Sequence, residues 1–131
     1  MIAAFETTWA PRILSVMRMV VGLLLLEHGT QKFLGFPAYV TGGAPAAMSP
    51  SWYAGLIELV CGALIAVGFL TRPAAFLASG MTAVAYFMVH APRSFFPINN
   101  GGELAIVYCF VLLYLAAVGG GAWSLDALKR R

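Results

Sequence analysis

The chain has 131 residues, of which 61 % are hydrophobic and only 10 % are charged, and its net charge is +3. A soluble domain of this size carries about 25 % charged residues, so the composition excludes an ordinary soluble domain and indicates one integral membrane domain over residues 1–131. The small and scattered net charge also excludes nucleic-acid binding.

Four apolar segments are each long enough to cross a bilayer as a helix, which takes roughly 17–25 residues. They extend over approximately residues 13–33, 51–70, 73–91 and 101–118. The predicted fold class is therefore all-α, an integral membrane bundle of four transmembrane helices.

The segments between and beyond the spans predict how the helices are joined. The first span is expected to begin after Pro11. Only Thr71 and Arg72 join the second and third spans, so we expect these two helices to form a tight antiparallel hairpin. After the fourth span, the sequence SLDALKRR predicts a short interfacial helical turn that is capped by Ser124.

The distribution of basic residues predicts the orientation in the membrane. Four spans place both termini and the turn between the second and third spans on one side. That side holds Arg12, Arg72, Lys129, Arg130 and Arg131, and the other side holds Lys32 and Arg93. By the positive-inside rule, both termini are predicted to be cytoplasmic.

This topology gathers most ionisable residues of the spans at the outer end of the bundle. The candidate ligand-binding residues are Glu27, His28, Gln31, Lys32, Glu58, Tyr86, His90, Arg93, Asn100 and Glu103. Helical spacing aligns several polar residues of the third span in one stripe, namely Ser79, Thr82, Tyr86, His90 and Arg93. Arg18 lies near the inner end instead, and we expect its side chain to snorkel to the cytoplasmic face.

Glu58 is the strongest candidate for a functional group. A charge near the centre of a span costs about 2.5–3.5 kcal/mol and therefore needs a partner or a proton. Two interpretations stay open: Glu58 is a site carboxylate, or it forms a structural ion pair or hydrogen bond that holds the first and second helices together. Lys32 and Arg93 either contribute to the site or snorkel to the headgroups.

Two further pairs of candidate residues also have alternative interpretations. Glu27 and His28 are adjacent, so they point about 100° apart on a helix and cannot share one narrow site. They either line a cavity or mark the polar end of a helix. Asn100 and Glu103 fit a capping box, in which Asn100 accepts free amides and Glu103 reaches back. Such a helix terminus is also suited to binding a polar ligand.

The sequence does not favour a metal site or a disulfide framework. The Glu-x-x-His pattern of di-iron bundles is absent, so no metal ligands are predicted. Cys61 and Cys109 both lie in apolar runs, where cysteine is usually a small apolar filler, although a dithiol at similar depth is an alternative.

Taken together, the motifs resemble those of the DoxX family of small membrane proteins. The resemblance rests on a basic residue early in the first span, HGTQKF at 28–33, Glu58 in GLIELVCG, His90, NNGGELA at 99–105, and GGGAWSLDAL before the C-terminus. It covers about residues 12 to 128. One departure is Gly-Gly-Gly at 119–121, where the family usually has Gly-Pro-Gly, and we expect it to loosen the exit of the fourth helix.

The resemblance implies a four-helix, multi-pass protein of the prokaryotic inner membrane. The family takes its name from a subunit of a quinone-linked sulfur-oxidising oxidoreductase, and other members have been tied to membrane redox and oxidative-stress complexes. The expected surroundings and partners are therefore the lipid bilayer and other membrane redox proteins, with a homo-oligomer as a further option.

The function favoured at this stage is a redox-linked membrane subunit with an outer-facing polar pocket for a quinone or another small molecule. Glu58 and His90 are its candidate proton relay, with Lys32 or Arg93 stabilising negative charge on a carbonyl oxygen. The alternative is a non-catalytic anchor or assembly partner of another enzyme, and a small-solute transporter is less favoured. The sequence has no haem, flavin or nucleotide signature, so catalysis by this chain alone is left open.

Overall fold

A computed structural model describes residues 1–39 and 42–130. The secondary structure of these residues is helical. The elements are α1 (Ile2–Ala4), η1 (Phe5–Trp9), α2 (Ala10–Leu34), α3 (Pro50–Val67), α4 (Thr71–Ala85), η2 (Tyr86–His90), α5 (Pro97–Asn100), α6 (Glu103–Val118) and α7 (Leu125–Leu128), where η marks a π-helical turn. The all-α prediction is confirmed.

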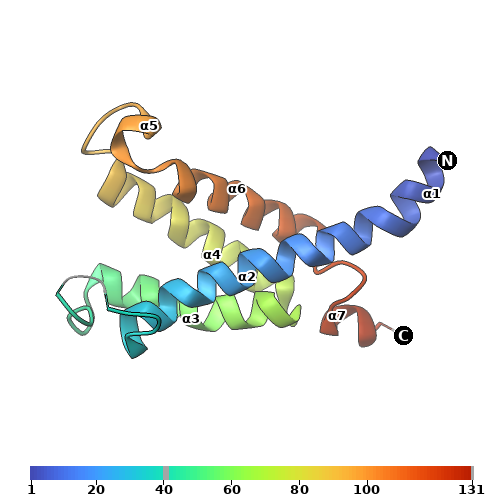
Figure 1. Ribbon diagram of the computed structural model, residues 1–131, viewed down its shortest axis with the longest axis horizontal. Coiled ribbons are helices and arrows are strands. Elements are labelled where there is room, and N and C mark those ends of the chain that lie inside the picture. Colours follow the sequence, from blue (N-terminus) through green and yellow to red (C-terminus); the bar gives the residue numbers. More distant parts are fainter. Residues whose placement is uncertain (40–41, 131) are drawn as a thin grey trace.

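The long helices form two pairs, α2 with α3 and α4 with α6. The two pairs meet near the turn between α3 and α4, and they diverge toward the end that carries the loop after α2 and the loop before α5 (Figure 1). The connection between α3 and α4 is short, but it consists of residues 68–70, because Thr71 and Arg72, which were predicted to form it, already belong to α4. The expected tight hairpin is not found either, because these helices separate along their length and a cavity lies between them.

Glycines let the backbones of α2 and α3 approach closely. An added Cβ at Gly29 would lie 2.6 Å from the Leu59 nitrogen, and one at Gly62 would lie 2.5 Å from the Leu26 nitrogen. Small residues at a helix interface allow this kind of packing in membrane proteins. The contacts also set the register, since they bring residues 26–29 of α2 level with residues 59–62 of α3.

The core lies where the two helix pairs meet. Its buried apolar residues are Leu25, Cys61, Ile65, Ala74, Ala75, Ala78, Tyr108, Leu112 and Leu115. All four long helices contribute to this set. The alanines come from α4, where small side chains allow close approach to the other helices.

The helix boundaries differ from the predicted ones mainly at two places. The first helix begins well before Pro11, because α1 and the π-helical turn η1 continue directly into α2. The third helix changes from α4 to the π-helical turn η2 at Tyr86. The predicted cap at Ser124 is confirmed, since its Oγ accepts the Ala127 amide at 3.1 Å.

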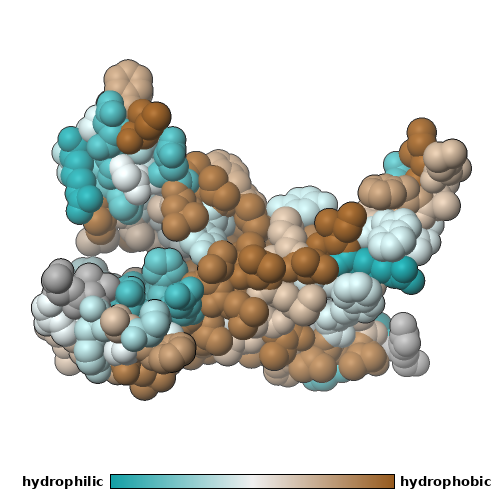
Figure 2. Space-filling model, in the orientation of Figure 1, coloured by the Kyte–Doolittle hydropathy of each residue, from teal (hydrophilic) through white to brown (hydrophobic). Residues whose placement is uncertain are grey.

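Within the described residues, three helical stretches are long and apolar enough to cross a membrane, namely Ile2–Leu34, Pro50–Val67 and Thr71–His90. α6 is also apolar but has only 16 residues. Large apolar side chains such as Phe76, Phe87 and Phe110 point outward, each at least 65 % exposed. Figure 2 shows the resulting hydrophobic surface over the middle of the molecule, with hydrophilic residues concentrated toward the left end.

Candidate functional site

An ion pair between α2 and α3 is the polar centre of the candidate site. Lys32 Nζ lies 2.6 Å from Glu58 Oε2, and the two side chains are 23 % and 10 % exposed. Glu58 begins the third turn of α3, and Lys32 lies near the C-terminus of α2. The pair has the geometry of the structural interpretation of Glu58, because it joins the first and second long helices.

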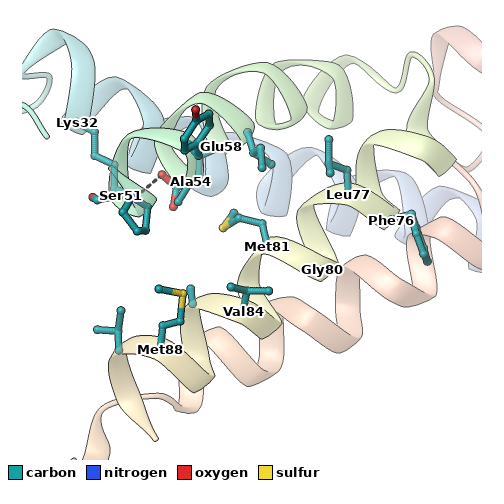
Figure 3. A pocket seen from close by; sticks show the side chains of 15 residues that line it. Lys32, Ser51, Ala54, Glu58, Phe76, Leu77, Gly80, Met81, Val84 and Met88 are labelled. Carbon is teal, nitrogen blue, oxygen red and sulfur yellow. Dashed lines mark hydrogen bonds and ion pairs between the residues drawn. The ribbon is translucent and has the colours of Figure 1, made fainter. Parts of the chain in front are cut away.

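The same ion pair forms part of the wall of a cavity of about 570 Å³ between α3 and α4. Figure 3 shows Lys32, Ser51, Ala54 and Glu58 on one side, facing residues of α4 on the other. The rest of the lining is largely apolar and includes Tyr53, Ile57, Phe76, Leu77, Met81, Val84 and Met88. The arrangement offers an ammonium group and a carboxylate at one place in an otherwise apolar space.

Gly80 of α4 lies on the open side of this cavity. An added Cβ at this position would meet no other atom within 4 Å. Gly80 therefore differs from the glycines between α2 and α3, where an added Cβ would collide with backbone. Because Gly80 lines the cavity, a side chain introduced at this position starts in open space beside it.

A second polar group lies around Asn100, the last residue of α5, and the neighbouring turn η2. The Asn100 Nδ2 donates to Tyr86 Oη at 3.2 Å and to the Ser94 carbonyl at 3.0 Å. His90 Nδ1 lies 3.1 Å from the Asn100 carbonyl oxygen. The His90 ring stacks on the Tyr86 ring, with 6.3 Å between the ring centroids. The structure thus brings Tyr86, His90 and Asn100 together, but in a group separate from the ion pair of Lys32 and Glu58.

The capping box at residues 100–103 is only partly correct. The Asn100 Oδ1 accepts the Gly102 amide at 2.7 Å, so Asn100 does satisfy a free amide. However, Gly102 rather than Asn100 is the cap residue of α6, and among the described residues the Glu103 side chain donates or accepts no hydrogen bond. The left-handed Gly101, with φ of 71°, makes the tight turn that separates α5 from α6.

The remaining predicted site residues lie outside both groups. Glu27, His28, Arg93 and Glu103 are exposed, and Gln31 is half-buried. The His28 ring contacts Tyr108 of α6 edge-on, with 6.3 Å between the ring centroids.

The polar stripe of the third helix begins with Ser79, which contacts α6 rather than the ion pair. Ser79 Oγ donates to the Cys109 carbonyl at 2.7 Å and lies 3.6 Å from its Sγ. Thr82 Oγ1 donates to the Ser79 carbonyl at 2.9 Å. Cys61 and Cys109 are both free thiols, and Cys61 is part of the core. Within the stripe, Ser79 therefore joins α4 to α6, whereas the Thr82 hydrogen bond lies within α4.

Arg18 does not snorkel to a membrane face, because it is only 1 % exposed. Its guanidinium donates to four backbone carbonyls, those of Ile65 and Ala66 at 2.6 Å, Trp123 at 2.7 Å and Gly120 at 2.8 Å. The expectation was wrong because the acceptors are carbonyls released at the end of α3 and in the segment after α6. Carbonyl acceptors have no side-chain signature in a sequence.

Gly120 and Gly121, which follow α6, pack tightly against neighbouring residues, so the expected loosening of the helix exit is not found. An added Cβ at Gly120 would lie 2.7 Å from Ser124 Cβ, and one at Gly121 would lie 2.5 Å from Ser15 Oγ. Gly121 also has a φ of 81°, which disfavours other residues.

The short helix α7 is held to the turn between α3 and α4. The Asp126 carboxylate accepts the amides of Leu70 and Thr71, each at 2.9 Å. Burial alone would raise the pKa of this carboxyl, but the amide hydrogen bonds and the nearby Arg130 hold the pKa below its ordinary value. The end of the bundle that carries both termini is thus fixed by Asp126 and Arg18.

The family comparison agrees with this arrangement, because the DoxX family model matches residues 13–91. The chain belongs to the DoxX family. The matched region contains α3, α4 and every residue that lines the cavity. Membership in this family and the apolar helices together make the chain a multi-pass membrane protein.

Proteins of two bacteria are similar to this DoxX protein. It is 44 % identical to an uncharacterized protein of Haemophilus influenzae over 122 residues, which cover 90 % of this chain and 91 % of the relative. It is also 33 % identical to an uncharacterized membrane protein of Mycobacterium tuberculosis over 124 residues, covering 83 % and 76 % of the two chains. No solved structure matches the chain.

Proposed function

We propose that this DoxX protein binds a lipophilic small molecule with a polar head, of the quinone type, in the cavity between α3 and α4. In this proposal it serves as a redox-linked subunit of the prokaryotic inner membrane. The single observation that carries the proposal is the position of the Lys32–Glu58 ion pair in the wall of an otherwise apolar cavity.

The size and lining of the cavity suit such a ligand. Pockets for small molecules typically have volumes of about 300–1,000 Å³ and apolar walls with a few polar groups that fix orientation. The cavity of about 570 Å³ lies within this range, and Lys32 and Glu58 are its charged lining residues. Several lining residues, including Phe76, Leu77 and Val84, are also exposed on the surface of the bundle. A ligand dissolved in the bilayer would therefore reach the cavity sideways.

The ion pair offers complementary chemistry to a carbonyl-bearing ring. The Lys32 ammonium has three donors, so it can keep its bond to Glu58 and donate another to a ligand carbonyl oxygen. Its positive charge would stabilise negative charge that develops on that oxygen during reduction. Glu58 would exchange a proton with the same oxygen. The electrons would come from a partner protein, and this chain would bind and orient the ring.

His90 has a different place in the proposal. It does not line the cavity, and it contacts Asn100 and Tyr86 in the second polar group. We therefore assign ligand binding to Lys32 and Glu58. A relay from His90 to Glu58 would require a path through ordered water or a change in the separation of the helix pairs.

The proposal includes four spans with both termini in the cytoplasm. α6 has 16 residues and is about 24 Å long at 1.5 Å per residue, somewhat less than the hydrocarbon thickness of about 30 Å. Both termini lie at the same end of the bundle as the turn between α3 and α4 (Figure 1), as four spans require.

A test of ligand binding uses Gly80→Leu, which fills the cavity from its open side. The purified protein in detergent is melted with and without a short-tailed benzoquinone, and then with a short-tailed naphthoquinone. We expect at least one quinone to raise the melting temperature of the unmodified protein, and Gly80→Leu to abolish that shift. Ala63→Leu is the matched control, because Ala63 is exposed on α3 and does not line the cavity.

The outcome is decisive in both directions. The absence of a shift with either quinone in the unmodified protein would remove the basis for quinone binding. A shift that survives in Gly80→Leu would show that the ligand binds at another site.

The alternative function is a non-catalytic anchor or assembly partner. It predicts that Glu58→Gln and His90→Gln lower the yield of folded protein or complex without any effect on ligand binding. The exposed Glu27 and His28 favour a protein partner of some kind.

A further inference from the structure

Glu27 and His28 are exposed at the middle of the bundle. The contacts of Gly29 with Leu59 and of Gly62 with Leu26 bring them level with residues 59–62. These residues lie just beyond the midpoint of α3, which extends over Pro50–Val67. Both side chains are nevertheless on the outer surface. Their exposure is therefore not explained by the end of a helix leaving the membrane.

The direction of each side chain follows from the helical period. The residues of α2 that are buried against the bundle are Ser15, Arg18, Gly22, Leu25 and Gly29. At 100° per residue, Glu27 points almost directly away from this face, and His28 points to one side. Glu27 continues the outward ridge formed by Val16, Val20 and Leu23. An acid and an imidazole thus interrupt an apolar surface that lipid would otherwise cover.

Ionisable residues at this depth almost always face protein or a water-filled cavity. In the described part of the chain, the Glu27 side chain has no hydrogen-bond or ion-pair partner, and His28 has the edge of the Tyr108 ring. The cavity between α3 and α4 does not include either residue. The missing partner must therefore come from outside the protomer, and it must offer both an acceptor and a donor.

We propose that this face of α2 is the interface of a homodimer, in which Glu27 of each copy pairs with His28 of the other. All copies of one membrane protein cross the bilayer in the same direction. A two-fold axis along the membrane normal therefore places each residue at the same depth in both copies. Because Glu27 and His28 are adjacent, their depths differ by about 1.5 Å. The face is therefore self-complementary, and the axis generates two acid–imidazole pairs. Gln31, one turn further along α2, flanks them.

The first test is cross-linking in native membranes. In a chain with Cys61→Ala and Cys109→Ala, the substitution Leu24→Cys places a single thiol on the outward face of α2, one turn from His28. We expect oxidation to give a covalent dimer. Ala63→Cys is the control, because Ala63 is exposed on α3 and follows Gly62, which packs against Leu26 at nearly the same depth. It should give little or no dimer.

The second test exchanges the polar pair. Glu27→His alone or His28→Glu alone places like residues opposite one another, and either should reduce the Leu24→Cys dimer about threefold or more, as expected for one interhelical hydrogen bond in a membrane. The double variant Glu27→His with His28→Glu restores unlike pairs, so it should recover the dimer. This recovery separates a lost contact from a lost fold, because the double variant has the same composition as the unmodified chain.

Several results would overturn the proposal. One is a Leu24→Cys protein that gives no dimer while the Ala63→Cys control does. Another is a set of single variants that cross-link as well as the unmodified pair, or a double variant no better than the singles. A native mass spectrum that shows one copy of this chain with a different protein would assign the face to that protein instead.

Discussion

Lys32 on α2 and Glu58 on α3 form an ion pair, with 2.6 Å between Nζ and Oε2, that also lines a cavity. One contact therefore holds two helices together and sets the polarity of the space beside them. Removal of one partner from such a pair leaves an uncompensated charge, whereas removal of both leaves none. A comparison of the single and double variants can therefore separate the contribution of the ion pair to stability from its contribution to ligand binding.

Lys32→Met should lower the free energy of unfolding by about 2–4 kcal/mol, because Glu58 is then left without its cation in a largely buried place. The double variant Lys32→Met with Glu58→Met should recover most of this loss. Thermal melting in one detergent measures both. Glu58→Met alone completes the comparison. A double variant whose loss of stability equals the sum of the losses in Lys32→Met and Glu58→Met would show that the two residues are not coupled.

The close approach of α2 and α3 predicts opposite effects for alanine at different glycines. Gly29→Ala and Gly62→Ala place a Cβ about 2.5–2.6 Å from backbone atoms of the partner helix, so each should destabilise the protein by about 1–3 kcal/mol. Gly80→Ala is the control. The added Cβ of Gly80→Ala meets open space. This variant should leave the free energy of unfolding unchanged or raise it by about 0.5–1 kcal/mol, because alanine reduces the conformational freedom of the unfolded chain. Equal melting temperatures for all three variants would contradict the described packing.

The positions of the long helices were predictable because each is a sustained apolar run, and apolar composition is what a bilayer selects. The ion-pair interpretation of Glu58 was also within reach, since a carboxylate inside a span requires a partner. The division of the polar residues into two groups was not predictable. Helical spacing places Ser79, Thr82 and Tyr86 on one face, but it does not say whether α3 or α6 covers that face.

Arg18 illustrates a different limit of the sequence. Its predicted depth, near one end of the first span, is compatible with snorkelling as well as with burial, and only the fold reveals the carbonyls that surround it. Similarly, the π-helical turn η2 changes the directions of the side chains along the third helix from Tyr86 to His90. Residues 86–90 contain no proline or glycine from which this turn could be predicted.

Arg18→Lys should lower the free energy of unfolding by about 2–4 kcal/mol. An ammonium has three donors at one point and cannot reach four separated carbonyls, so at least one carbonyl is left unsatisfied. Arg72→Lys is the matched control, because Arg72 is exposed and donates to the carbonyls of Ala117 and Val118. It should cost less than about 1 kcal/mol. Similar losses of unfolding free energy in the two variants would show that the four hydrogen bonds of Arg18 contribute no more to stability than those of Arg72.

Asp126 predicts a pH dependence of stability. Its pKa in the folded protein lies below the ordinary value of 3.8, so the folded state favours the carboxylate. The contribution is fully present above that ordinary value and is lost as the pH falls through the lower folded pKa. Asp126→Asn should therefore be less stable than the unmodified protein at neutral pH, and the difference should shrink below about pH 4. Melting curves across this range measure it, and a constant difference would rule out the carboxylate as its cause.

Asn100 should matter far more than its neighbour Asn99. Asn100 is 2 % exposed and its side chain bonds Tyr86, Ser94 and Gly102, so Asn100→Ala should cost about 2–3 kcal/mol of unfolding free energy. Asn99→Ala changes an exposed side chain and should cost less than about 0.5 kcal/mol. The two variants are compared by thermal melting, and similar midpoints would show that the hydrogen bonds of Asn100 contribute little.

The surroundings of Arg18 also impose an order on assembly. Two of its carbonyl acceptors lie 102 and 105 residues further along the chain, in the segment after α6. Until residues 120–123 have been synthesised, the Arg18 guanidinium lacks two of its four carbonyl acceptors. Its charge becomes fully compensated only when residues 120–123 reach the bundle. The hydrogen bonds of Arg18 therefore connect the first long helix to a segment that is among the last to be synthesised.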